Sequence, residues 1–148
     1  MLSNRFRWLR GVVIALLVLL AIQFEFGMAV NLSDLPSLTP FGFSLAGIVG
    51  ALNQAGAVAL IHASLGTLLT IVSLVGLVMA LASKVTGVRI FGILGFVSMA
   101  VAELNGVLFT LSGFQTDGYS HGMATNFILT FGFYFLELYF LKPNQAEN

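Results

Sequence analysis

Two histidines and two glutamates are the side chains of this sequence best suited to chemistry as a group. They are Glu25, His62, Glu103 and His121, and each lies in a different long apolar segment. Imidazole and carboxylate bind metal ions and carry protons, and imidazole also ligates haem iron. The chain has no cysteine, which excludes disulfides, thiolate ligands, iron–sulfur clusters and a cysteine nucleophile.

The composition decides what kind of protein must position these side chains. Of the 148 residues, 58 % are apolar and 8 % are charged, the formal net charge is zero, and the mean hydropathy is +1.00. A soluble domain carries about a quarter charged residues. The composition therefore excludes a soluble enzyme domain, a disordered regulator and a nucleic-acid binder with a basic face. We expect an integral membrane protein with no nucleic-acid partner.

Four apolar segments are long enough to cross a bilayer, whose core of roughly 30 Å needs about 20 helical residues. They run over about 11–30, 56–82, 90–112 and 120–141. Short connections make neighbouring helices antiparallel. The sequence thus predicts an all-α integral membrane protein, a four-transmembrane-helix bundle forming a single membrane domain over 1–148. Small residues on the second and third spans indicate close helix packing: Gly66, Ser73, Gly76, Gly92, Gly95 and Gly106.

The apolar stretch over about 41–52 is too short to span. Pro36 and Pro40 precede it and stop any helix there. If the stretch simply continued the second span, that helix would run about 42 residues, roughly 60 Å. We expect a short interfacial or re-entrant segment between the first and second spans, and a second helix that projects from the membrane is the alternative.

The positive charges predict the orientation. All six basic residues fall on one side of a four-span chain: Arg5, Arg7, Arg10, Lys84, Arg89 and Lys142. The opposite side carries Asp34 and Asp117. The positive-inside rule makes the basic side cytoplasmic and places both termini there. The first span has the basic flank of a signal peptide, but it is long for one and no clear cleavage site follows, so we expect it to be retained.

Ionisable residues inside a span usually face the bundle interior or a water-filled cavity and mark function. At about 1.5 Å per residue, Glu25, His62, Glu103 and His121 lie roughly 9, 9, 14 and 2 Å below the outer surface. The sequence therefore predicts that they converge in one outward-opening site in the outer half. Gln23, Asn105 and Asn126 lie at similar levels, and Glu137, near the cytoplasmic end, is the exception.

The fourth span carries two polar stripes more than about 100° apart around the helix. One stripe contains His121, Thr125, Ile128 and Gly132; the other contains Asn126, Thr130 and Glu137. Both stripes cannot face one site. Aromatic residues also cover every face of the inner half of this span, and we attribute them to lipid contact and an interfacial belt: Phe131, Phe133, Tyr134, Phe135, Tyr139 and Phe140.

Three chemistries fit the four site residues. A b-type haem would take His62 and His121, the only histidines, as axial ligands. A zinc, iron, manganese or copper ion would take Glu25, His62, Glu103 and His121. Without any cofactor, Glu103 beside a histidine would carry protons or bind cations. A histidine in a span is also often only a hydrogen-bonded packing residue.

Three parts of the chain carry a resemblance. They are residues 22–32 (IQFEFGMAVNL), residues 62–66 (HASLG), and the pair 103–106 (ELNG) and 117–123 (DGYSHGM). Together they resemble a group of small four-span bacterial membrane proteins of unassigned function. This resemblance implies the four-span topology and a bacterial plasma membrane. The pattern His62-x-x-x-Gly66 is also similar to the haem-ligating helix of membrane b-type cytochromes, which implies haem ligation by His62.

The sequence therefore predicts a membrane ligand- or cofactor-binding protein with an outward-facing Glu/His site, with b-type haem and electron transfer as the first hypothesis. A small transport or proton- or metal-handling subunit is the alternative from another class. A structural accessory subunit of a larger membrane complex is the third. The expected partners are the lipid bilayer and either further copies of the chain or a larger membrane complex. Motifs of soluble enzymes such as the P-loop, G-x-S-x-G and H-E-x-x-H are missing, so the sequence leaves catalysis open.

Overall fold

Five helices make up the fold in a computed structural model that describes residues 2–33, 38, 40 and 42–142. The part of the chain so described contains no strand. The helices are α1 (Leu2–Leu32), α2 (Leu45–Ala55), α3 (Ala57–Leu81), α4 (Thr86–Leu111) and α5 (Asp117–Phe140).

Four of these helices, α1, α3, α4 and α5, are long and apolar enough to cross a membrane. The predicted all-α four-span architecture is therefore confirmed, although the helices extend beyond several predicted span limits. The largest difference is at α1, which already begins at Leu2 and so carries Arg5, Arg7 and Arg10 on its first turns.

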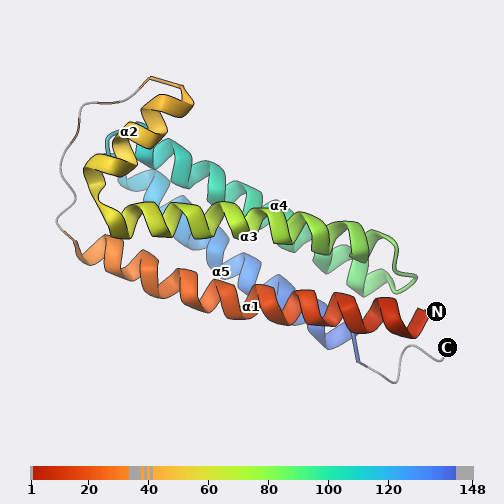
Figure 1. The fold of residues 1–148 in the computed structure, drawn as a ribbon. Helices are drawn as coiled ribbons and strands as arrows, with labels where there is room; N and C mark the ends of the chain where they lie inside the picture. The colour runs from red at the N-terminus through yellow and green to blue at the C-terminus, as the bar shows by residue number, and fades with distance from the viewer. Residues whose placement is uncertain (1, 34–37, 39, 41, 143–148) are drawn as a thin grey trace.

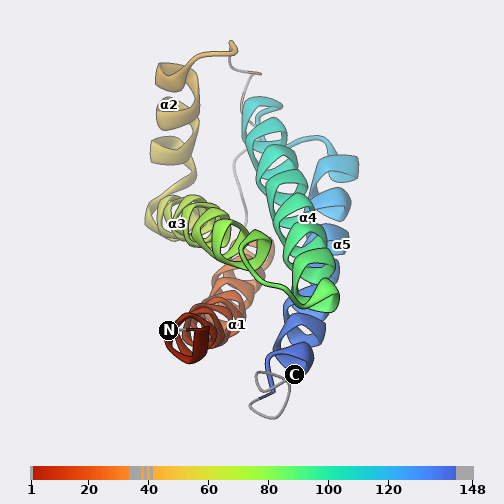
Figure 2. The same ribbon diagram turned by 90° about the vertical axis from the view of Figure 1, so that its right-hand side faces the viewer.

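The four long helices form an antiparallel bundle (Figure 1). α1 packs against α3 and α5, and α4 packs against the same two helices, so α1 lies diagonally across from α4. Seen from the end, α1 and α3 lie on one side and α4 and α5 on the other (Figure 2). The start of α1, the end of α5 and the α3–α4 turn share one end of the bundle, which we call the basic end because all six basic residues lie there.

The short helix α2 lies at the opposite end and packs against α3 and α4. Its N-cap, Ser44, accepts a 3.0 Å hydrogen bond from the Gly47 backbone N–H. Its C-cap, Gly56, has φ 98° and ψ 176°, a conformation that only glycine adopts readily, and the chain bends there before α3. The sequence predicts a separate short segment over about 41–52; the helix begins about four residues later and ends about three residues later, and Phe41 lies outside the described residues.

The core of the bundle is set by one stripe of α1. Leu9, Val13, Leu16 and Leu20 are buried at intervals of three and four residues, which is the spacing of one helix face. They pack with Leu69 of α3, Met99 of α4 and Tyr134 of α5. The next residue of this stripe, one turn further along α1, is Gln23 and not Glu25. The packing of the core therefore determines that Gln23 is the polar residue of α1 that faces inward.

Candidate functional site

Gln23 of α1 is the polar residue that the core stripe places between helices. It is buried, and its Nε2 donates a 3.0 Å hydrogen bond to the backbone carbonyl of His62 on α3. The His62 ring packs against Gly27, one turn further along α1: a Cβ at Gly27 would lie 3.1 Å from His62 Cε1. The α1–α3 interface in this half of the bundle is therefore built from an amide, an imidazole and a glycine.

Glu103 of α4 reaches the same place from across the bundle. Its Oε1 accepts a 2.9 Å hydrogen bond from Thr67 Oγ1. Its Oε2 occupies the space left open by Gly66, where a Cβ would lie 2.7 Å from Oε2 and 3.3 Å from Gln23 Nε2. The missing side chain of Gly66 thus brings the carboxylate beside the amide, and α1, α3 and α4 together form a polar cluster.

Two buried atoms of this cluster have no hydrogen-bond partner: Gln23 Oε1 and His62 Nδ1. Buried polar atoms are nearly always hydrogen-bonded, and an unpaired one costs about 1–3 kcal/mol. In a membrane no solvent lowers that cost. Unpaired atoms beside a carboxylate are the arrangement expected of a site that completes its hydrogen bonds with a ligand.

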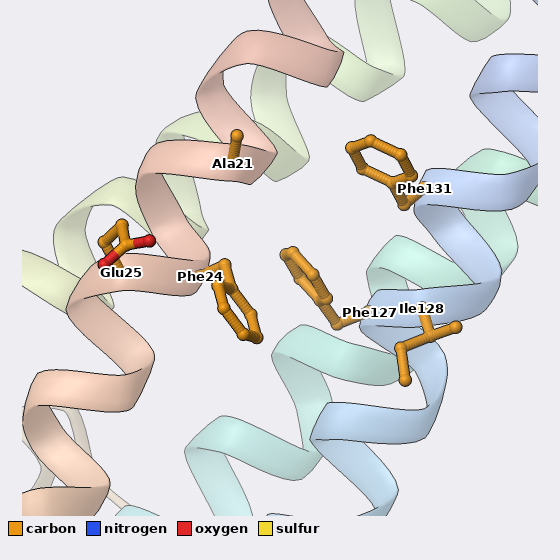
Figure 3. A pocket seen from close by; sticks show the side chains of 6 residues that line it. All are labelled: Ala21, Phe24, Glu25, Phe127, Ile128 and Phe131. Atoms are coloured by element: carbon orange, nitrogen blue, oxygen red, sulfur yellow. The ribbon is translucent and has the colours of Figure 1, made fainter.

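Glu25, a predicted member of the site, points away from the cluster. It is exposed and lines the α1 edge of a groove of about 330 Å³ between α1 and α5. Figure 3 shows Phe24 facing Phe127 and Phe131 across this groove, with Glu25 on the α1 side; the Phe24 and Phe127 ring centroids are 6.0 Å apart. Because Glu25 is two positions after the buried Gln23, it lies roughly 200° further around the helix, on the opposite face.

His121, the other predicted ligand, is exposed on the first turn of α5. Of the two polar stripes predicted on this helix, the one with His121, Thr125 and Ile128 is exposed. The stripe with Asn126, Thr130 and Glu137 turns inward, and Thr130 and Glu137 are 0 % and 1 % exposed. The rotation of α5 that buries Glu137 therefore carries His121 to the outside, away from the cluster.

The four predicted site residues are consequently divided. His62 and Glu103 join one cluster, and Glu25 and His121 do not. In residues 2–33, 38, 40 and 42–142, no group of three or more His, Asp or Glu side chains is placed to hold a metal ion. The described residues give no support to the metal interpretation, nor to a haem held between His62 and His121.

A second polar cluster lies in the half of the bundle nearer the basic end. Tyr134 of α5 is 1 % exposed, and its hydroxyl hydrogen-bonds the buried hydroxyl of Ser73 on α3. Glu137, one turn further on, reaches Gly92 of α4, where a Cβ would lie 3.3 Å from its Oε1. The attribution of the whole aromatic run to lipid contact is wrong for Tyr134, because this ring fills the bundle interior next to Gly95.

The sequence contains partial signals for three residues that are not part of the predicted site. Gln23 shares the three- and four-residue spacing of the buried leucines of α1. Gly92 and Gly95, three residues apart, mark the face of α4 that receives Tyr134 and Glu137. Neither signal identifies which helix fills the gap, since that depends on how the helices are rotated against one another.

Comparisons with known proteins add no relative. No protein-family model, no curated protein and no solved structure matches this chain. The function must therefore be argued from the two clusters themselves.

Proposed function

We propose that this chain is an integral membrane ligand-binding protein whose site is the cluster of Gln23, His62 and Glu103, and that its ligand carries a small cation such as an ammonium group. The observation that carries the proposal is the Glu103 carboxylate, which extends into the bundle over Gly66 beside two unpaired buried atoms.

The free atoms of the cluster match the donors of an ammonium group. An ammonium has three N–H donors and no acceptor. Glu103 Oε2 and Gln23 Oε1 are acceptors, and His62 Nδ1 is a third when the imidazole proton is on Nε2. A bound cation also offsets the cost of a carboxylate within a span. A cation bound at Glu103 would thus lie in the same cluster as the two unpaired acceptors.

We expect methylammonium to stabilise the protein by binding at Glu103. At about 100 times its dissociation constant, a ligand raises the free energy of unfolding by about 2.7 kcal/mol. Thermal unfolding of the protein in lipid nanodiscs, with methylammonium chloride compared with sodium chloride at equal ionic strength, measures this effect. Glu103→Gln should abolish the stabilisation, because a neutral amide replaces the anionic acceptor.

Glu25→Gln is the matched control, because Glu25 lies on α1 outside the cluster. This variant should respond to methylammonium as the unsubstituted protein does. The proposal fails if methylammonium gives no more stabilisation than sodium, or if Glu103→Gln responds as strongly as Glu25→Gln.

The basic end would face the cytoplasm of a bacterium, with the Gln23–His62–Glu103 cluster in the outer half of the plasma membrane. Six basic residues at one end support this orientation.

The orientation can be measured with single introduced cysteines, because the chain has no cysteine of its own. In intact cells, a membrane-impermeant thiol reagent should label Thr116→Cys, before α5, and leave Thr86→Cys, at the start of α4, unlabelled until the cells are lysed. The reverse pattern would refute the orientation. Both threonines are exposed, so the two variants are matched.

A proton- or cation-handling transport subunit is the second candidate function. The observation in its favour is a second carboxyl group inside the bundle. Glu137 is buried in the half of the bundle nearer the basic end.

A further inference from the structure

Glu137 is a buried carboxyl group that the ammonium site does not use. It is 1 % exposed, and its Oε1 has no hydrogen-bond partner. The side chain lies in a notch on α4: a Cβ at Gly92 would lie 3.3 Å from Glu137 Oε1 and 2.6 Å from the Cβ of Ala80 on α3. α3, α4 and α5 thus enclose the carboxyl group.

No basic side chain is placed to neutralise this carboxyl group. All six basic residues of the chain are exposed, and Lys142, the nearest in sequence, lies 3.8 Å above the Tyr139 ring. Groups beside Glu137 include Gly92 of α4 and Ala80 of α3, with Tyr134 and the Ser73 hydroxyl one turn deeper. Burying an isolated carboxylate costs several kcal/mol, and a neutral carboxylic acid avoids much of that cost.

Glu137 lies near the basic end of the bundle. Glu137 precedes the end of α5 at Phe140 by one turn, about 5 Å along the helix. A layer of buried apolar side chains, Leu16, Leu20, Leu69 and Met99, lies deeper in the bundle toward Glu103. Glu137 is therefore nearer to the end of α5 than to Glu103, and buried apolar side chains, Val88 and Leu141 among them, also lie toward the basic end.

We propose that Glu137 is a second site, which binds a proton exchanged with water at the basic end of the bundle. In binding, one O–H bond of a hydronium ion at the basic end breaks and leaves water, and one O–H bond forms at a carboxylate oxygen of Glu137; release is the reverse step. An apolar side chain of the same size would fill the notch without an unpaired oxygen, so packing alone does not account for a carboxyl group here. This site is independent of the ammonium site at Glu103.

Infrared spectroscopy of the protein in lipid nanodiscs tests the proposal. At neutral pH we expect the C=O stretching band of a protonated carboxylic acid. Glu137→Gln should remove this band, whereas Glu25→Gln and Glu103→Gln should retain it. Transfer of the folded protein into D₂O should shift the band to lower frequency as deuterium replaces the proton.

Two results with the unsubstituted protein and Glu137→Gln would overturn the proposal. One is a spectrum in which Glu137→Gln leaves the protonated-acid region unchanged. The other is a Glu137 band that does not shift in D₂O while the protein stays folded, because a locked proton would make the group purely structural. If Glu137→Gln does not fold, Glu137→Asp keeps an acid in a shorter side chain, and the band should persist at a changed frequency. Its absence from the folded aspartate variant would also contradict the proposal.

Discussion

Gly92→Leu should lower the free energy of unfolding by about 3 kcal/mol, the upper part of the range for overpacked interiors. Any Cβ at this position would lie 2.6 Å from the Cβ of Ala80, which is bonded directly to the α3 backbone and cannot rotate away. The larger leucine would also displace Glu137. α3 and α4 must therefore separate along the face where Gly92 meets Ala80. Unfolding in detergent micelles by sodium dodecyl sulfate, followed by circular dichroism, measures the loss.

Gly132→Leu is the control for this prediction. Gly132 lies in the middle of α5, is exposed, and has no atom within 4 Å of the position of an added Cβ. Its substitution should not lower the stability, because nothing opposes the new side chain and leucine favours a helix interior over glycine by up to about 1 kcal/mol. Equal losses from the two variants would mean that α3 and α4 do not meet closely at Gly92.

Tyr134→Ala is the second large effect, with an expected loss of about 3–5 kcal/mol. Tyr134 is the largest of the fully buried side chains in the described residues, and it reaches from α5 to Ser73 on α3. Its removal leaves a cavity at the centre of the bundle and an unpaired serine hydroxyl. Tyr134→Phe keeps the ring and should cost only about 0.6 kcal/mol, the average for a hydrogen bond between membrane helices.

Phe135→Ala serves as the matched control, because the neighbouring Phe135 is 61 % exposed and faces outward from the bundle. The same detergent unfolding measurement applies. If Phe135→Ala costs as much as Tyr134→Ala, or if Tyr134→Phe costs as much as Tyr134→Ala, the ring does not fill the core in the way described.

The helices themselves were predictable from the sequence because the signals for them are local. A span needs only enough consecutive apolar residues to match the thickness of the bilayer, and these residues can be counted directly in the sequence. The separate short segment follows from the same reasoning, since its apolar stretch is too short to span. Only the structure shows that it is a helix, α2, which ends at Gly56 with a positive φ. The placement of all six basic residues at one end of the bundle likewise follows from the number of spans alone.

The site was only partly predictable, because helical phase within a single span does not say which stripe is buried. His62 and Glu103 were expected to meet, and the structure brings them into one cluster through Gly66 and Gln23. Glu25 and His121 were expected there as well, on the argument that ionisable residues of similar depth converge. Depth describes only the position along the helix axis. Side chains at the same depth meet only if each helix is rotated so that they point toward one another.

What the sequence by itself determined, then, is that this chain forms four membrane-length helices, with a short separate segment between the first two and its basic residues at one end. Tertiary structure decided the rotation of each helix, because burying the leucine stripe of α1 and Tyr134 of α5 against their neighbours settles all other faces at once. That rotation turned Gln23 and Glu137 inward and left Glu25 and His121 outside. The physical reason is that a helix is rigid, so the side chains that pack best determine where the polar ones point.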